Sequence, residues 1–127
     1  MTDLIEVQTS TLAGAALDWA VAQVEGIEVA IAEPHYGTDW RVYRPESGGK
    51  YSPSTDWAIG GPLLNKHCTS FGVVQDGSAS RWRSFAYKAE TGMSRIAGGE
   101  SILIAACRAI VMLNLSDIVQ VPKELMS

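Results

Sequence analysis

The sequence predicts one α+β domain, residues 1–127, in which apolar helices cover a small antiparallel sheet, similar in layout to an α/β/α sandwich. Its 127 residues suit a single core, and neither an internal repeat nor a linker divides them. Hydrophobic residues make up 46% and charged residues 19%, the composition of a globular protein. Apolar residues recur at helical spacing in two long segments and alternate with polar residues in shorter ones, which predicts both helices and strands.

The net charge and the longest apolar run indicate which partners are not expected for this protein. The net charge of −4 gives no broad positive field for duplex DNA, although one local site could still hold a small phosphorylated ligand. The longest apolar run, near Ile102 to Leu115, contains Arg108 and is too short to span a membrane. No basic segment followed by an apolar stretch opens the chain. We therefore expect a cytoplasmic protein with neither duplex nucleic acid nor a membrane as its partner.

The two cysteines, Cys68 and Cys107, predict neither a metal site nor a disulfide framework. They are far apart in sequence and do not stand at metal-ligand spacing. In a chain without an export signal they are expected to be reduced, buried, small apolar side chains. We expect no metal and no cofactor.

A first helix is predicted from Thr9 to Val24, with Thr9 or Ser10 as its N-cap and Gly26 just beyond its end. Its apolar arc is wider than one contact requires, which suggests a second covering surface, either a loop or another subunit. Its acidic residues Asp18 and Glu25 are expected on a solvated face. The alternating segment Ile27–Ala32 predicts a half-buried strand.

The middle of the chain is rich in loop-forming residues. Pro34 to Pro53 holds many Gly, Pro, Ser and aromatic residues, and only Trp40–Tyr43 could form a strand. A loop of this length is usually functional or disordered. Ser54-Thr55-Asp56 is expected to cap a short helix, which Pro62 should kink or break.

A hairpin and a second long helix are predicted next. Strands at Thr69–Val74 and Arg81–Tyr87 flank a loop with turn chemistry, Gln75–Ser80. Along the second strand Trp82, Ser84 and Ala86 should face one way, and Arg81, Arg83, Phe85 and Tyr87 the other. The Gly-rich segment Gly92–Gly99 should lead into a helix at Ser101–Leu115, capped by Ser101. Asp117–Leu125 is predicted to be an extended tail.

The first candidate site is the segment Tyr51–Trp57, at the start of the predicted short helix. Hydroxyls of Ser54 and Thr55 could bind phosphate there, because a helix N-terminus offers free N–H groups and a positive dipole end. Tyr51 and Trp57 could stack on a base. The alternative is a plain N-cap with Trp57 in the core.

Two further candidates combine basic and aromatic residues. Arg81 and Arg83 could hold phosphate while Trp82 stacks on a base. The alternative is an edge strand protected by charge, with Trp82 buried. The segment His35–Arg41 places aromatic residues on the long loop, for recognition or as a lid folded onto the core.

No motif indicates catalysis. The only histidines, His35 and His67, have no partner motif, and the sequence contains no nucleophile elbow, zinc-protease motif or P-loop. We expect a protein that is not an enzyme.

Three segments together resemble the NinX-like group of small phage and prophage proteins. They are Leu12–Ala22, then Tyr51–Trp57 followed by Gly60–Leu64, and last Ile104–Arg108. The resemblance spans about residues 9 to 125 and implies a phage accessory protein that acts in the host bacterial cytoplasm. Phage sandwich proteins of similar appearance include sponges, which bind the cyclic-nucleotide signals of host defence without cleaving them.

The resemblance and the candidate residues lead to one hypothesis, a non-enzymatic sponge for a small nucleotide-type signal. A homo-oligomer with ligand sites between subunits would suit the wide apolar helix faces. The expected ligand-binding residues are Tyr51, Ser54, Thr55, Trp57, Arg81, Trp82 and Arg83. The alternatives are a protein-binding factor that inhibits a host enzyme or modulates recombination, a nucleotide hydrolase, and a structural part of the virion.

Overall fold

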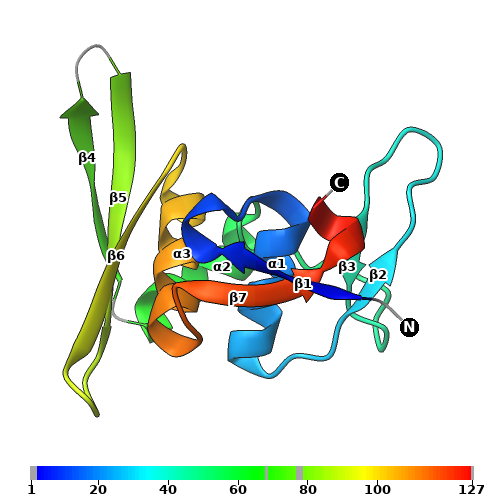
Figure 1. Cartoon of the computed structure of the whole chain (residues 1–127), viewed down its shortest axis with the longest axis horizontal. Helices are drawn as coiled ribbons and strands as arrows, with labels where there is room; N and C mark the ends of the chain where they lie inside the picture. Colours follow the sequence, from blue (N-terminus) through cyan, green and yellow to red (C-terminus); the bar gives the residue numbers. More distant parts are fainter. Residues whose placement is uncertain (1–2, 68, 77–78, 127) are drawn as a thin grey trace.

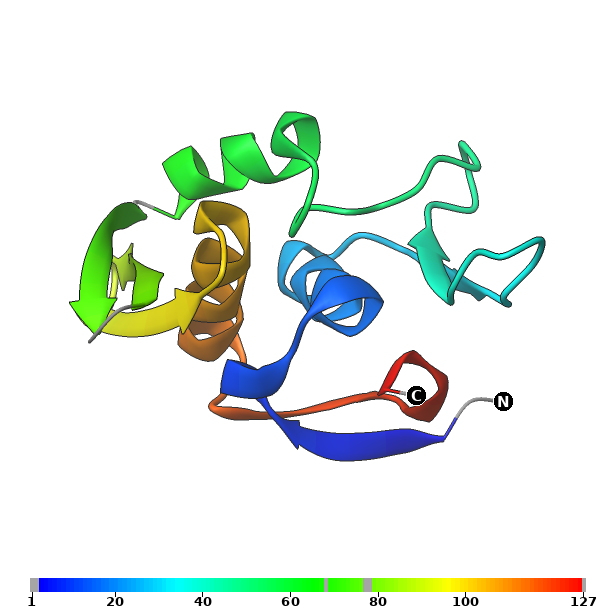
Figure 2. The same ribbon diagram turned by 90° about the horizontal axis from the view of Figure 1, so that it is seen from above.

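A computed structural model describes residues 3–67, 69–76 and 79–126. Two helices, α1 (Gly14–Glu25) and α3 (Ile102–Asn114), pack against each other at the centre, and a third, α2 (Trp57–Lys66), lies against α3 (Figures 1 and 2). Among the residues that the structure describes, three small antiparallel sheets surround these helices. The predicted α+β class is therefore confirmed, although the sheet is divided into three.

The three sheets join segments at different distances along the chain. One pairs β1 (Leu4–Gln8) with β7 (Ile118–Pro122), so that the two ends of the chain lie side by side (Figure 1). The second pairs β2 (Ala30–Ala32) with β3 (Arg41–Tyr43). The third has the order β4 (Ser70–Asp76), β5 (Ala79–Lys88) and β6 (Met93–Gly99).

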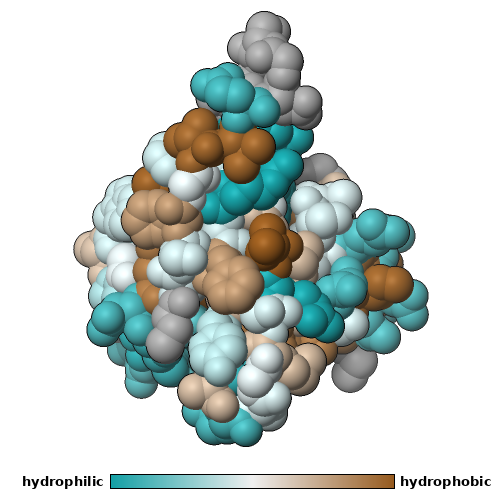
Figure 3. Space-filling model, turned by 90° about the vertical axis from the view of Figure 1, so that its left-hand side faces the viewer, coloured by the Kyte–Doolittle hydropathy of each residue, from teal (hydrophilic) through white to brown (hydrophobic). Residues whose placement is uncertain are grey.

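Helix α3 packs on one face of the sheet β4–β5–β6. Ser84 and Ala86 of β5 are buried on that face, while Phe85 and Tyr87 are exposed on the other, as the alternation predicted. In the part of the chain that the structure describes, this sheet is covered on one side only, unlike a full α/β/α sandwich. We call the uncovered side the outer sheet face; Figure 3 looks onto it and shows apolar side chains among polar ones.

The main core lies between α1, α3 and the strands β3 and β7. Its fully buried side chains include Leu17, Val21, Val42, Ile110 and Val121. The wide apolar arcs of α1 and α3 are thus covered by elements of the same chain, so they do not by themselves require a second subunit. The homo-oligomer stays a prediction. No helix among the described residues is both long and apolar enough to cross a bilayer.

The first helix begins later than predicted. Thr9–Thr11 forms a 3-10 turn, and α1 starts at Gly14, whose φ of +57° turns the chain. The predicted cap residue Thr9 instead ties this turn to the far end of the chain, because its Oγ1 donates to the Ser116 carbonyl at 2.8 Å. The predicted end is confirmed, since Gly26 has a φ of +67° and donates to the Ala22 and Gln23 carbonyls.

Other boundaries were predicted with mixed success. The strand expected at Ile27–Ala32 is only Ala30–Ala32, whereas the short strand within Trp40–Tyr43 and the Ser101 cap of α3 are confirmed. Of the kink or break predicted at Pro62, the break is wrong, because α2 continues through this residue, and the kink stays a prediction. Strands β1 and β6 were not predicted. Cys107 is buried as expected, while Cys68 and residues 77–78 of the hairpin loop lie outside the described residues.

Candidate ligand-binding groove

A groove of about 570 Å³ lies where α2, β5 and the start of α3 meet. Its walls include four of the residues predicted to bind a ligand: Ser54, Thr55, Trp57 and Trp82. The remaining lining comes from the segment Glu100–Ile104. We call this site the tryptophan groove. Its lining residues span the sequence from Ser54 to Ile104.

The two indole rings occupy different positions in the groove. Trp57, the first residue of α2, is 53% exposed, so the alternative that placed it in the core is wrong. Trp82 is partly buried, and its ring meets Phe71 edge to face at a centroid distance of 6.4 Å. Contact with Phe71 limits the rotamers of Trp82 and keeps its ring at the groove.

The N-terminus of α3 also lies at the groove. Ser101 caps it by accepting a hydrogen bond from the Ile104 N–H at 3.1 Å, which leaves the N–H groups of Ile102 and Leu103 without helical acceptors. These donors and the helix dipole favour an anion. The carboxylate of Glu100, which is exposed in the same groove, opposes that effect.

The start of α2 does not form the anion site that the sequence suggested. Asp56 is its N-cap, and its Oδ1 accepts from the Ala58 N–H at 2.9 Å, so a carboxylate already occupies this helix end. Ser54 is 1% exposed, so its hydroxyl is not accessible to a ligand, whereas Thr55 is exposed. The phosphate role predicted for Ser54 is therefore corrected, while that of Thr55 stays a prediction.

Tyr51 lies in the main core and not in the groove. It is 4% exposed, its N–H donates to the Val42 carbonyl at 2.9 Å, and burial raises its pKa well above the ordinary value. A ring enclosed in this way has no free face, so Tyr51 cannot stack on a ligand as predicted.

Asp18 positions the segment that leads to the groove. Its side chain is buried in α1, and Oδ1 accepts from the Ser54 N–H at 2.9 Å. Burial raises the pKa of Asp18 to about 6, although hydrogen bonding from Ser54 offsets part of that rise. The solvated position predicted for Asp18 is thus wrong, and nothing in its local sequence indicated this anchoring role.

Arg81 and Arg83 line a separate pocket of about 340 Å³. They alternate with Trp82 along β5 and therefore face the opposite side of the strand. Their pocket, which we call the arginine pocket, also includes Ser10, Gly98 and Arg108. The two arginines predicted to bind phosphate therefore line a different pocket from the two tryptophans predicted to stack on a base.

One stretch of the chain matches a known family, and it contains helices α1, α2 and α3, the tryptophan groove and the arginine pocket. The model of the family described as NinX of bacteriophage P22 matches residues 8–114. The chain belongs to the NinX family. It is therefore a phage-related protein, as the sequence resemblance implied. None of the curated proteins matches the chain.

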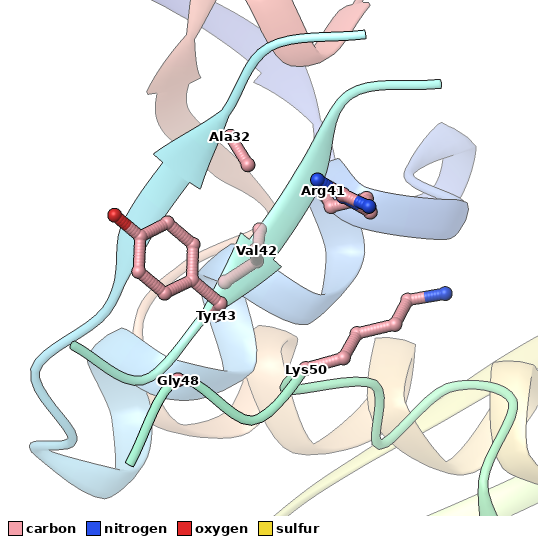
Figure 4. A pocket seen from close by; sticks show the side chains of 6 residues that line it. All are labelled: Ala32, Arg41, Val42, Tyr43, Gly48 and Lys50. Atoms are coloured by element: carbon pink, nitrogen blue, oxygen red, sulfur yellow. The ribbon is translucent and has the colours of Figure 1, made fainter. Parts of the chain in front are cut away.

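Within this NinX family member, the loop candidate His35–Arg41 contributes to a third pocket of about 410 Å³. Figure 4 shows the side chains of Arg41 and Lys50 extending to the same side of β3, with Ala32 nearby on β2. Tyr36 is 93% exposed and does not fold onto the core, while the recognition role of the loop stays a prediction. Trp40 instead packs against the main core.

His67 has a partner that sequence reasoning missed. Its Nε2 lies 2.8 Å from Oε2 of Glu25, and Lys66 Nζ lies 2.6 Å from Oε1 of the same carboxylate. The Glu25 side chain is only 6% exposed, so its predicted solvated position is also wrong. Burial tends to raise the pKa of Glu25, but the bonds to Lys66 and His67 outweigh it and lower the pKa. This cluster connects the ends of α1 and α2.

Proposed function

We propose that this NinX family member is a non-enzymatic phage accessory protein that binds a cyclic-nucleotide signal of host defence and sequesters it in the host cytoplasm. The tryptophan groove carries the proposal. Stacking of a base on an aromatic side chain contributes about 1–3 kcal/mol and tolerates any base. Trp57 and Trp82 offer two such surfaces in a groove of ligand size.

Recognition of phosphate in this groove would come from backbone and hydroxyl donors. The free N–H groups of Ile102 and Leu103 begin α3, and the Thr55 hydroxyl is exposed in the same groove. Glu100 disfavours an isolated anion there. A ligand that combines base stacking with phosphate contacts would therefore bind better than phosphate alone.

The chemistry of the lining favours binding over turnover. Among the described residues that form the groove, Glu100 is the only acidic or basic side chain. General acid–base catalysis usually pairs titratable groups within reach of the reacting atoms. A groove made of rings, hydroxyls and aliphatic side chains can hold a nucleotide without this machinery.

The first test is calorimetry of the full chain with cyclic di- and trinucleotides and with the isomers of cyclic ADP-ribose. We expect binding of at least one, and a loss of about tenfold or more in affinity in Trp57→Ala, from the stacking energy. The matched control is Tyr87→Ala, which removes an exposed ring from the outer sheet face. Absence of heat with every nucleotide, or equal weakening in both variants, contradicts the proposal.

The second test separates sequestration from hydrolysis. A bound nucleotide released by heating should return with its mass unchanged, whereas appearance of linear products would identify a hydrolase. Native mass spectrometry of the purified protein measures a retained nucleotide and also tests the proposed homo-oligomer.

A protein-binding role is the second candidate, and the outer sheet face favours it. Phe85, Tyr87 and Ile96 are exposed there, and contiguous apolar surface of this kind marks interaction sites. A host enzyme captured stoichiometrically by the wild type but not by Ile96→Lys would support this role. Equal capture by both proteins would exclude this face as the contact.

A further inference from the structure

Three arginines line the arginine pocket, although the chain carries a net charge of −4. Arg81 and Arg83 come from β5, and Arg108 comes from α3, so the pocket joins two elements that pack against each other. The hydroxyl-bearing Ser10 completes the polar lining. Like charges that are brought together repel one another, and a bound negatively charged group offsets that repulsion.

Main-chain carbonyls hold Arg108 in place. Its Nε donates to the Leu12 carbonyl at 2.7 Å, and its Nη1 donates to the Gly98 carbonyl at 2.8 Å. These bonds orient the guanidinium without neutralising its charge. A guanidinium carries five N–H donors, so others stay available to a ligand.

Gly98 makes room for Arg83. A Cβ at position 98 would collide with Nη1 of Arg83, because the guanidinium lies directly against the glycine. Arg83 Nη1 also donates a long hydrogen bond to the carbonyl of Trp82, at 3.5 Å. The absence of a side chain at position 98 thus allows the Arg83 guanidinium to lie against β6, at the residue whose carbonyl Arg108 binds.

The positive charge of this pocket is not balanced by ion pairs. Within residues 3–67, 69–76 and 79–126, neither Arg81, Arg83 nor Arg108 pairs with a carboxylate, whereas Arg44 and Arg95 do. Burial lowers the pKa of Arg108, Arg81 lowers it further, and Glu100 acts in the opposite direction. Arg108 therefore feels the repulsion of Arg81 more than the attraction of any paired acid.

We propose that the arginine pocket is a binding site for a phosphate-type anion. Planar guanidinium groups match the oxygens of phosphate through paired N–H donors, and the fixed position of Arg108 reduces the entropy lost on binding. A bound anion would also relieve the repulsion among the three cations. The site is separate from the tryptophan groove, so this inference stands without the proposed nucleotide.

The test is calorimetry of the full chain with inorganic pyrophosphate at low ionic strength. We expect binding to the wild type, and at least tenfold weaker binding to Arg81→Ala, which removes an exposed side chain. Arg41→Ala is the matched control, because Arg41 lines the pocket between β2 and β3 and forms no ion pair among the described residues. Pyrophosphate binding should be unchanged in this control.

Gly98→Ala provides a second variant that keeps all the charges. Its added methyl group should displace the flexible Arg83 guanidinium and weaken pyrophosphate binding, with circular dichroism confirming that the fold is retained. Absence of pyrophosphate binding in the wild type, or equal affinities of Arg81→Ala and Arg41→Ala variants, overturns the proposal.

A cyclic dinucleotide serves as the second ligand in the same variants. If Arg81→Ala weakens both ligands, the pocket holds a phosphate of the nucleotide; if it weakens pyrophosphate alone, the pocket serves a free anion. Trp57→Ala should leave pyrophosphate binding unchanged. Failure of the nucleotide proposal is therefore distinguishable from failure of this one.

Discussion

Two buried carboxylates in α1 show where inference from single residues stops. Asp18 and Glu25 lie two turns apart on one helix face, and acidic residues in that arrangement usually face solvent. Here the segment before α2 covers Asp18, and the end of α2 covers Glu25. Helical spacing identifies residues that share a face, but it does not reveal which distant segment packs on that face.

Burial of Asp18 predicts a pH-dependent stability. The folded pKa of about 6 lies above the ordinary value of 3.8, so the folded chain binds the proton more tightly than the unfolded chain between these pH values. The free energy of unfolding should therefore fall as pH rises from 4 to 7, by up to roughly 3 kcal/mol from this group. Asp18→Asn should lack this decrease, because the amide oxygen can accept from Ser54 without a charge.

Urea unfolding at pH 4, 5, 6 and 7 measures the effect. The stability of Asp18→Asn relative to the wild type should increase with pH through this window. Asp39→Asn, an exposed site with the same change of charge, should show no such trend. A constant difference between Asp18→Asn and the wild type would show that the carboxylate is not penalised by burial.

Residue identity predicted the tryptophan groove in part. The prediction relied on aromatic and hydroxyl residues near a helix start and on a strand. Of these residues, Thr55, Trp57 and Trp82 do line one groove. Tyr51 of the same segment lies in the main core instead, and Ser54 is buried although it lines the groove. The composition of this segment does not show how deeply each residue lies: residues 51–54 are buried, whereas residues 55–58 are exposed.

At the level of elements, two adjacent glycines of α2 differ in how closely other atoms approach them. Gly60 is closely packed, whereas Gly61 has space around it. A Cβ at Gly60 would collide with the Pro53 carbonyl and approach Cδ2 of Leu103 to 2.9 Å. A Cβ at Gly61 would lie 3.6 Å from Cε3 of Trp57, an ordinary contact. An alanine substitution at Gly60 therefore tests close packing, and the same substitution at Gly61 tests intrinsic helix propensity.

Gly60→Ala should destabilise the protein by about 1–3 kcal/mol, because the main chain at Pro53 must move. Gly61→Ala should be neutral or stabilising by up to about 1 kcal/mol, since alanine favours a helix more than glycine does. Thermal unfolding of both variants measures the contrast. Equal melting temperatures would contradict the close approach of α2 to the segment that precedes it.

Strands were harder to predict than helices. Helix α3 was predicted almost to the residue, because its apolar residues repeat regularly and Ser101 caps it. Strand β6 contains Gly98 and Gly99, which favour turns in isolation. It forms a strand because β5 offers seven paired positions and because Gly99 must approach α3 closely. Whether such a segment forms a strand depends on its pairing with another strand, and the local sequence does not show which strand that is.

At the level of the whole molecule, the two ends of the chain close the fold. Strand β1 pairs with β7 over five positions, and Thr9 donates to carbonyls of both Ser116 and Asp117 just before β7. Val119 and Val121 of β7 belong to the same core as α1 and α3. The core is therefore complete only when contacts more than 100 residues apart have formed, a topology that short-range sequence patterns cannot predict.

This closure predicts that damage to β7 weakens the entire chain. Val121 is fully buried in the main core, so Val121→Ala should lower the free energy of unfolding by about 1–3 kcal/mol. Ile118→Ala removes a larger side chain from the same strand but at a site that is 52% exposed, so it should cost less than about 1 kcal/mol. Urea unfolding followed by tryptophan fluorescence and by far-UV circular dichroism measures both variants. For Val121→Ala the two signals should shift together, because strand and helices unfold as one unit. A shift in only one signal would instead mean that the β1–β7 ladder opens independently of the helical core.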